Sequence, residues 1–374
     1  REHTRRYRVT YRKDTLVPRS EGGLARWWDR MRGEEFLTVK LYDTLRDHTP
    51  VALFPREIDY TEWQTLRRYP ILNWNMGMTY RLRERDERVY PQGELARRTI
   101  GQVGDKGNYG VEYVLRDVLE GRDGKARRQR IARGFYGRVV GGDNSEPEDG
   151  LDVVTTLDLE MQDVADRALR RQLEAQNALW GTALVMEVAT GDLLAMANLS
   201  RTKSGAYAEV KNHALSSRME PGSTFKAFTA YSVLANNEGI TPETTYTVPY
   251  SLEVYDTVIS DSHDHPYEDM TVRRILADSS NTGTTLMSRE VQTAQLYDTY
   301  RAFGFGQKTG CYFPGDTAGQ LEESKDWDGV QSATVTFGQG LTVSALQLVR
   351  AYGVLEQSGV MVTPHFLVDV PNDA

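Results

Sequence analysis

The chain has 374 residues, of which 39% are hydrophobic, and its formal net charge is −8. This length is enough for two or three domains, and the hydrophobic content argues against intrinsic disorder. The acidic balance argues against a general nucleic-acid-binding protein. A single cysteine, Cys311, excludes an intramolecular disulfide and, with six widely spread histidines, leaves no thiolate-based metal site, so we expect no cofactor.

The first 150 residues contain no pattern typical of a nucleophile or a metal site. Residues 7–11 predict a short strand and residues 60–68 a helix, with Gly and Pro punctuation between such runs. Basic residues gather at 1–13 and 121–138, where we expect a solvated face or a hairpin. The polar stretch 143–150 suits a domain boundary or a surface loop. We therefore expect a non-catalytic module over residues 1–150.

The second part, residues 151–374, predicts an α+β domain. Residues 151–156 favour a strand, and Asp158 suits the N-cap of a helix whose apolar residues recur at three-and-four spacing up to Leu173. Residues 181–188 and 193–197 predict a hairpin with a turn at 189–192. A two-stranded hairpin is marginal by itself, so further strands of an antiparallel sheet are expected from later in the chain.

The most informative stretch is residues 219–230, where a Pro-Gly turn precedes an apolar segment with helical spacing. Ser223 falls in the expected first helical turn, where free N–H groups and the helix dipole would stabilise an oxyanion. Lys226 lies three residues later on the same face. An amine kept neutral by burial could accept the proton of the serine, so the pair predicts a serine nucleophile with a lysine base. A serine N-cap beside a solvated lysine is the alternative.

The same spacing occurs at Ser200 and Lys203, but no apolar helix follows, so residues 200–203 are interpreted as a loop. Downstream, Ser279 and Asn281 lie in a second small polar group between apolar helical segments. A serine hydroxyl there could relay a proton, and an asparagine amide could bind a carbonyl. The alternative is a polar turn that ends a helix.

Together these stretches resemble the class B penicillin-binding proteins, the peptidoglycan transpeptidases. The matching segments are residues 88–101, 154–162, 220–226, 278–283 and 337–346, and the wording of 220–226 is most similar to the septal, cell-division member. The resemblance implies that Ser223 is acylated, that Lys226 is its base and that Ser279 and Asn281 form the second motif. It also implies that residues 1–150 form an elongated pedestal domain and residues 151–374 a transpeptidase domain.

The implied activity is D,D-transpeptidation: Ser223 attacks a stem peptide, D-alanine leaves, and an amine of a neighbouring stem forms the crosslink. β-Lactams are the implied covalent inhibitors, and a membrane glycosyltransferase and other division proteins the implied partners, without nucleic acid. The implied location is periplasmic, with anchoring in the cytoplasmic membrane by an N-terminal helix absent from this chain. A carboxypeptidase, a β-lactam-sensing acylase and a non-catalytic divisome scaffold are the alternatives.

The family carries a third motif, Lys-Thr/Ser-Gly, on a strand of its sheet. Residues 308–310 read Lys-Thr-Gly, but they lie in a glycine-rich stretch ended by a proline and come soon after Asn281. We therefore interpret Lys308 as a coincidence in a loop. By the resemblance, the true motif would follow Ala374, so the catalytic domain is expected to be incomplete at its C-terminus. We expect the edge of the 181–197 hairpin nearest Ser223 to be unpaired or occupied by residues that do not belong there.

Overall fold

The computed structural model describes residues 2–11, 51–52, 78–87, 90–104, 107–122, 128–132, 135–138 and 148–369, together with 62, 65, 68 and 145. The chain divides into two compact units, Arg1–Pro91 and Gln92–Ala374. The predicted boundary at residue 150 lies inside the second unit and stays a prediction. Within the described residues, no helix has the length and apolar character needed to cross a bilayer.

The described part of the first unit is an antiparallel sheet of three strands. Strand β1 (Glu2–Tyr11) pairs along its whole length with β3 (Met78–Glu87) and at its end with β2 (Val51–Ala52). The strand predicted at residues 7–11 is thereby confirmed, with a longer extent. Most of the predicted helix at 60–68 lies outside the described residues.

The second unit begins with three short helices and a hairpin. The helices are α3 (Arg97–Ile100), α4 (Gly110–Val114) and α5 (Arg116–Leu119). Strands β4 (Arg128–Ala132) and β5 (Phe135–Arg138) pair antiparallel, so the basic stretch at 121–138 does contain a hairpin.

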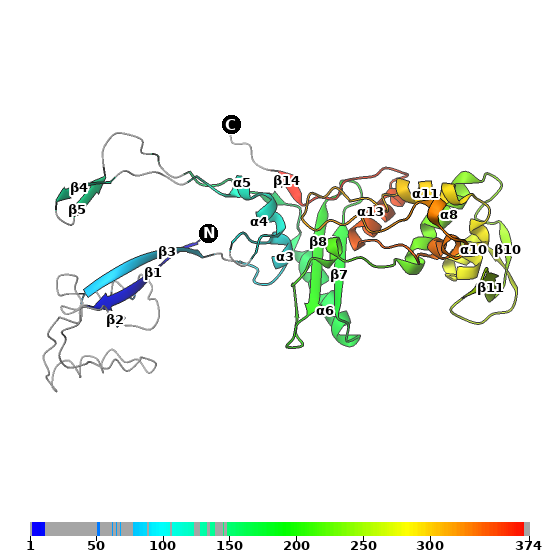
Figure 1. Cartoon of the computed structure of the whole chain (residues 1–374), viewed down its shortest axis with the longest axis horizontal. Helices are drawn as coiled ribbons and strands as arrows, with labels where there is room; N and C mark the ends of the chain where they lie inside the picture. The colour runs from blue at the N-terminus through cyan, green and yellow to red at the C-terminus, as the bar shows by residue number, and fades with distance from the viewer. Residues whose placement is uncertain are drawn as a thin grey trace. The chain divides into compact units, whose positions relative to one another are not determined.

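A sheet with one long helix alongside forms the middle of this unit (Figure 1). Strands β7 (Trp180–Met186) and β8 (Leu193–Arg201) form the predicted hairpin, and β9 (Tyr207–Ala208) pairs with the other side of β8. Helix α6 (Leu159–Ala175) begins at the predicted N-cap, because the Asp158 side chain accepts a hydrogen bond from the Met161 N–H at 2.8 Å. Within the described residues β7 has β8 as its single strand partner.

Two of the remaining strands pair with each other beside this hairpin sheet, where the Leu193 N–H donates to His365 O at 2.9 Å. The strand predicted at 151–156 is confirmed only as β6 (Val154–Thr155), which pairs with β14 (Leu367–Asp369). Its short length leaves residues 151–153 without strand pairing in the described structure.

Helices dominate the end of the unit beyond the hairpin sheet (Figure 1). The helices and turns are α7 (His213–Ser216), η2 (Gly222–Phe225), α8 (Lys226–Asn236), α9 (Val272–Ala277), α10 (Asn281–Ser288), α11 (Thr293–Ala302), η3 (Ser324–Asp326), α12 (Gly329–Thr334), η4 (Val335–Phe337) and α13 (Ala345–Glu356). Two small antiparallel pairs accompany them: β10 (Thr245–Val248) with β13 (Glu268–Thr271), and β11 (Ser251–Val254) with β12 (Thr257–Ser260).

An aromatic cluster forms the core of this helical part and fixes the start of α8. Phe225 and Phe228 are fully buried and pack against Tyr300 and Phe305, with ring centroids 4.7 to 5.5 Å apart. Fully burying each such ring contributes about 1.5–3 kcal/mol. The two phenylalanines flank Lys226 in sequence, so their burial carries the lysine into the interior of the protein.

Candidate active site

Ser223 lies in the single 3-10 turn, η2, that leads into α8. The side chain is exposed, and within the described structure no hydrogen bond joins its hydroxyl to another residue. The predicted position at the start of a helix is confirmed, with the difference that the first turn is 3-10 rather than α. The hydroxyl is therefore open to a substrate at the positive end of the α8 dipole.

Residues 337–343 hold the turn in front of Ser223. Met219 and Val343 exchange two backbone hydrogen bonds of 2.9 Å, and the Gly222 N–H donates to Gly338 O at 3.0 Å. Gly338 has φ +82°, and a Cβ there would come within 2.1 Å of Gly222 O. Only glycine allows this approach, so the tertiary structure joins two of the segments that carried the resemblance.

Lys226 is buried, with 2% of its surface exposed. Its amine donates to the main-chain oxygen of Ser279 and, at 3.1 Å, to the Ser279 hydroxyl. Burial lowers the pKa of Lys226 to about 8, an effect that the nearby negative charge of Asp261 partly opposes. A lysine with this pKa is neutral in an appreciable fraction of molecules near neutral pH, which is the property that a base requires.

The second predicted group lies between α9 and α10, as expected. Ser279 has φ +57°, a conformation that costs a non-glycine residue about 1 kcal/mol or more and persists only where the surroundings hold it. Asn281 opens α10 and donates from its side-chain amide to Ser260 O at 2.9 Å. The structure thus brings Ser279 to Lys226, whereas among the described residues no hydrogen bond joins Asn281 to Lys226 or Ser223.

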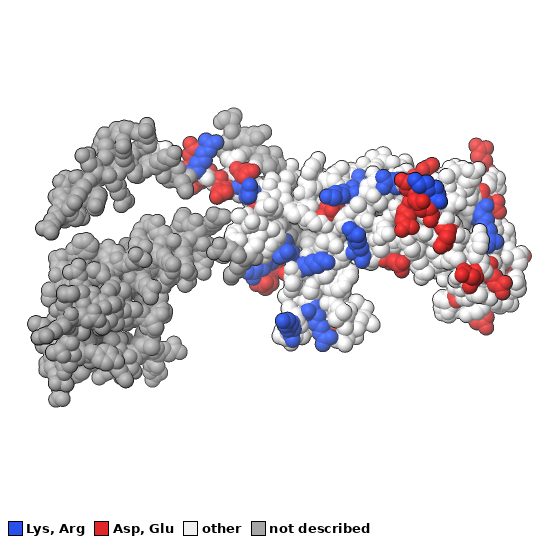
Figure 2. All heavy atoms as spheres, in the orientation of Figure 1, with Lys and Arg blue, Asp and Glu red and all other residues white. Residues whose placement is uncertain are grey.

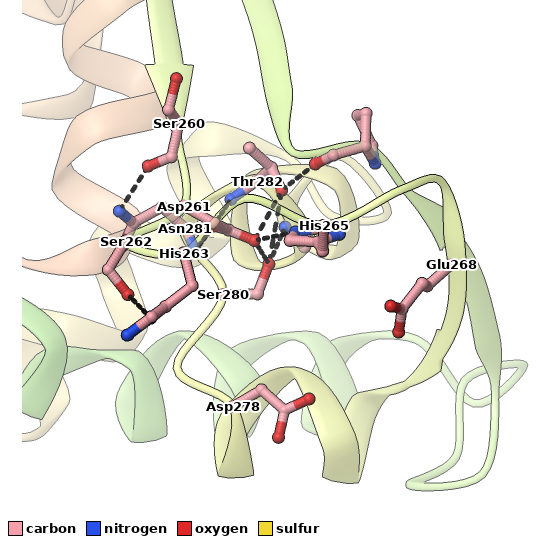
Figure 3. Close-up of polar contacts among 12 residues, drawn as sticks. Ser260, Asp261, Ser262, His263, His265, Glu268, Asp278, Ser280, Asn281 and Thr282 are labelled. Atoms are coloured by element: carbon pink, nitrogen blue, oxygen red, sulfur yellow. Dashed lines mark hydrogen bonds and ion pairs between the residues drawn. The ribbon is translucent and has the colours of Figure 1, made fainter.

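Asp261 and His265, which follow β12, were not predicted from the sequence. The Asp261 carboxylate accepts hydrogen bonds from the Ser280 hydroxyl at 2.6 Å and from the backbone N–H groups of Asn281 and Thr282 (Figure 3). His265 Nε2 lies 3.0 Å from the same carboxylate. Burial by itself would raise the pKa of Asp261, but these hydrogen bonds outweigh it and lower the pKa. The run of polar residues at 260–265 could have pointed to this contact, but nothing in its sequence spacing indicates that it lies near Ser279.

The second Ser-x-x-Lys copy is not in a loop throughout, so that interpretation is wrong at its start. Ser200 and Arg201 belong to β8, because β7 and β9 both pair with that end of the strand. The Ser200 hydroxyl lies 2.7 Å from Nε2 of the buried His213, which stacks on Trp180. This contact gives Ser200 a structural partner.

The Lys308-Thr309-Gly310 stretch does lie in a loop, as predicted. The backbone N–H groups of Thr309 and Gly310 donate to a single carboxylate oxygen of Asp316, at 2.9 and 3.2 Å. Lys308 is exposed, and within the described residues no contact joins it to Ser223 or Lys226. Its irrelevance to catalysis stays a prediction.

Charged side chains of both signs lie on the described surface of the chain (Figure 2). On the face seen in Figure 2, Lys and Arg side chains lie in small groups, several of them beside Asp and Glu side chains. Among the residues that the structure describes, no three His, Cys, Asp or Glu side chains are arranged to hold a metal ion.

Residues 181–372 match the family model of the penicillin-binding protein transpeptidase domain. The chain is 33% identical over 291 residues to a probable peptidoglycan D,D-transpeptidase, PenA, of Neisseria meningitidis, covering 75% of this chain and 49% of PenA. It is 31% identical over 293 residues to peptidoglycan D,D-transpeptidase FtsI of Escherichia coli, covering 75% and 48%. The chain thus spans about half the length of these curated relatives.

A solved structure gives the same result. Penicillin-binding protein 3 of Mycobacterium tuberculosis, complexed with aztreonam, superposes with a TM-score of 0.66 at 28% identity, covering 79% of this chain and 63% of that one. The matched region includes Ser223, Lys226 and the second polar group. By its family model, its relatives and its fold, the chain belongs to the penicillin-binding protein transpeptidase family, as a class B member.

Proposed function

We propose that this chain carries the acyl-transfer site of a peptidoglycan D,D-transpeptidase, with Ser223 as nucleophile and Lys226 as base. The observation that supports this best is the buried Lys226 amine with its lowered pKa, three residues after an exposed serine at a helix start. A solvated lysine beside a capping serine would show neither burial nor the contact with Ser279.

In the proposed reaction the neutral amine of Lys226 takes the Ser223 proton while Oγ bonds to the carbonyl carbon between two terminal D-alanines. The bond to the leaving D-alanine breaks, and the proton passes to its amine. Ser279, which already bonds Lys226, is placed to relay that proton, and we assign Asn281 to binding of the substrate amide. An amine of a second stem then attacks the ester and releases Ser223.

We further propose that the site acts in septal wall synthesis outside the cytoplasm, where stem peptides occur, as part of a longer chain anchored in the membrane. The likeness to FtsI supports the septal assignment, and contacts with a membrane glycosyltransferase and other division proteins would follow from it. β-Lactams would trap Ser223 as a stable ester, because they offer a strained amide in place of the stem peptide. The aztreonam complex of the tuberculosis relative supports this expectation.

The test is covalent labelling of the full-length protein by a fluorescent penicillin. Ser223→Ala should abolish the label, and Lys226→Arg should reduce it strongly, since a guanidinium stays charged and cannot accept the proton. Ser200→Ala is the matched control, because it removes the serine of the other Ser-x-x-Lys copy, and it should label like the parent. Labelling retained by Ser223→Ala would refute the proposal. Mass spectrometry of the products then separates crosslinking from hydrolysis, which distinguishes a transpeptidase from a carboxypeptidase.

A further inference from the structure

Asp261, in the loop after β12, forms hydrogen bonds with the residues that follow Ser279. Its carboxylate accepts from the three successive residues that follow Ser279, at distances that include 2.6 Å from the Ser280 hydroxyl and 3.0 Å from the Thr282 N–H (Figure 3). The preceding residue, Ser260, accepts from the Asn281 side chain. One short segment of chain therefore contacts every residue between 280 and 282.

These hydrogen bonds hold a turn in which the backbone of Ser279 is strained. Ser279 has positive φ, and both groups that it presents to Lys226, its main-chain oxygen and its hydroxyl, depend on that conformation. A non-glycine residue leaves this region of φ unless neighbouring contacts hold it. Two sets of contacts hold this conformation. The N–H groups of Ser279 and Ser280 donate to carbonyl oxygens at the end of α9, at 3.2 and 3.0 Å, and the residues after Ser279 donate to the Asp261 carboxylate.

Asp261 also acts on Lys226 by its charge. The carboxylate stays ionised, because hydrogen bonds outweigh the effect of burial on its pKa, and its negative charge raises the pKa of the Lys226 amine against the effect of burial. Among the described residues, the charged groups near this network include His265 on the same loop, Glu268 of β13, whose charge acts on His265, and Arg274 of α9, which forms an ion pair with Glu268. Charge and hydrogen bonding thus come from a single side chain.

We propose that Asp261 is a positioning residue for acylation: its carboxylate holds the Ser279–Asn281 turn against Lys226 and acts on that amine by its negative charge. The inference rests on the proposed function of Ser223 and Lys226. It predicts two separable effects of removing the carboxylate, one on geometry and one on charge.

The experiment measures the second-order acylation rate of the full-length protein by a chromogenic cephalosporin between pH 6 and 10. Asp261→Asn should lower the plateau, the constant acylation rate reached at high pH, by about 10- to 100-fold, because misplacement of catalytic groups by an ångström has effects of this size. It should also move the acid limb of the profile to lower pH, because the charge that raises the pKa of Lys226 is gone. A residue that merely stabilises the fold would change the amount of active protein without moving the limb.

Two further variants separate geometry from charge. Asp261→Glu keeps the charge but displaces the carboxylate by one methylene, so its plateau should fall while the limb stays in place. Asp264→Asn makes the same chemical change as Asp261→Asn at an exposed position of the same loop, and it should leave plateau and limb unchanged. Active-site titration corrects each rate for the folded fraction.

An acid limb that stays at the wild-type pH in Asp261→Asn overturns the proposal, whatever the plateau. If that variant does not fold, a plateau within twofold of wild type in Asp261→Glu overturns it. Wild type and Ser223→Ala are measured alongside. A wild-type protein that is not acylated at Ser223 would refute the proposed function and this inference with it. Normal acylation of the wild type, together with an unchanged pH profile in Asp261→Asn, would refute the inference alone.

Discussion

The burial of Lys226 predicts a definite pH dependence of acylation. With a pKa of about 8, the amine is neutral in about one tenth of molecules at pH 7 and in about half at pH 8. A solvated lysine with a pKa near 10.4 would be neutral in well under 0.1% at pH 7, so burial enlarges the reactive fraction on the order of a few hundredfold. The proposed base is therefore neutral in a useful fraction of molecules near pH 7 because the tertiary structure removes it from water.

The acylation rate should rise about fivefold from pH 7 to 8, by less than about twofold from pH 8 to 9, and then level off. The measurement is stopped-flow acylation of the full-length protein by a chromogenic cephalosporin, with Ser223→Ala run in parallel to subtract attack by hydroxide. A rate that keeps rising tenfold for each pH unit through pH 10 would show that Lys226 is solvated in the working enzyme, and the reasoning from its burial would then be wrong.

Three further predictions concern residues around Ser223 and Lys226. Gly338→Ala should lower the free energy of unfolding by about 1–3 kcal/mol and slow acylation, because a Cβ would meet Gly222 O at 2.1 Å. Gly359→Ala, also at positive φ but with nothing within 4 Å of its Cβ, should leave acylation intact. Equal acylation rates in the two variants would argue against a role of the Gly338–Gly222 contact in acylation. Lys308→Ala should change acylation by less than about tenfold, which is about 1.4 kcal/mol, and a larger loss in a variant with parental melting temperature would place Lys308 in the site. Phe228→Ala should cost about 3–5 kcal/mol in urea unfolding, and a loss below about 1 kcal/mol would mean that the aromatic cluster does not stabilise α8.

Much of the local structure could be predicted because it depends on neighbouring residues. The N-cap at Asp158 and the hairpin around residue 190 come from hydrogen bonding and alternation within a few positions, and both were found. The Ser223 and Lys226 pair was predicted for the same reason, since a Pro-Gly turn before an apolar helix places the two residues one turn apart. The loop character of Lys308 was also predicted, from the glycines around it.

Other features depend on contacts between distant parts of the chain. Ser200 was expected in a loop because its neighbours are polar, but pairing on both sides keeps it in β8. Asp261 lies 18 residues before Ser279, and a polar loop of that composition is ordinarily solvated; only the fold turns it toward the start of α10. The sequence by itself determined which residues could do the chemistry, because reactive groups and helical spacing are local properties. The tertiary structure decided the state of those groups, because the burial of Lys226, the strain at Ser279 and the charge of Asp261 arise from residues that meet only in the folded protein.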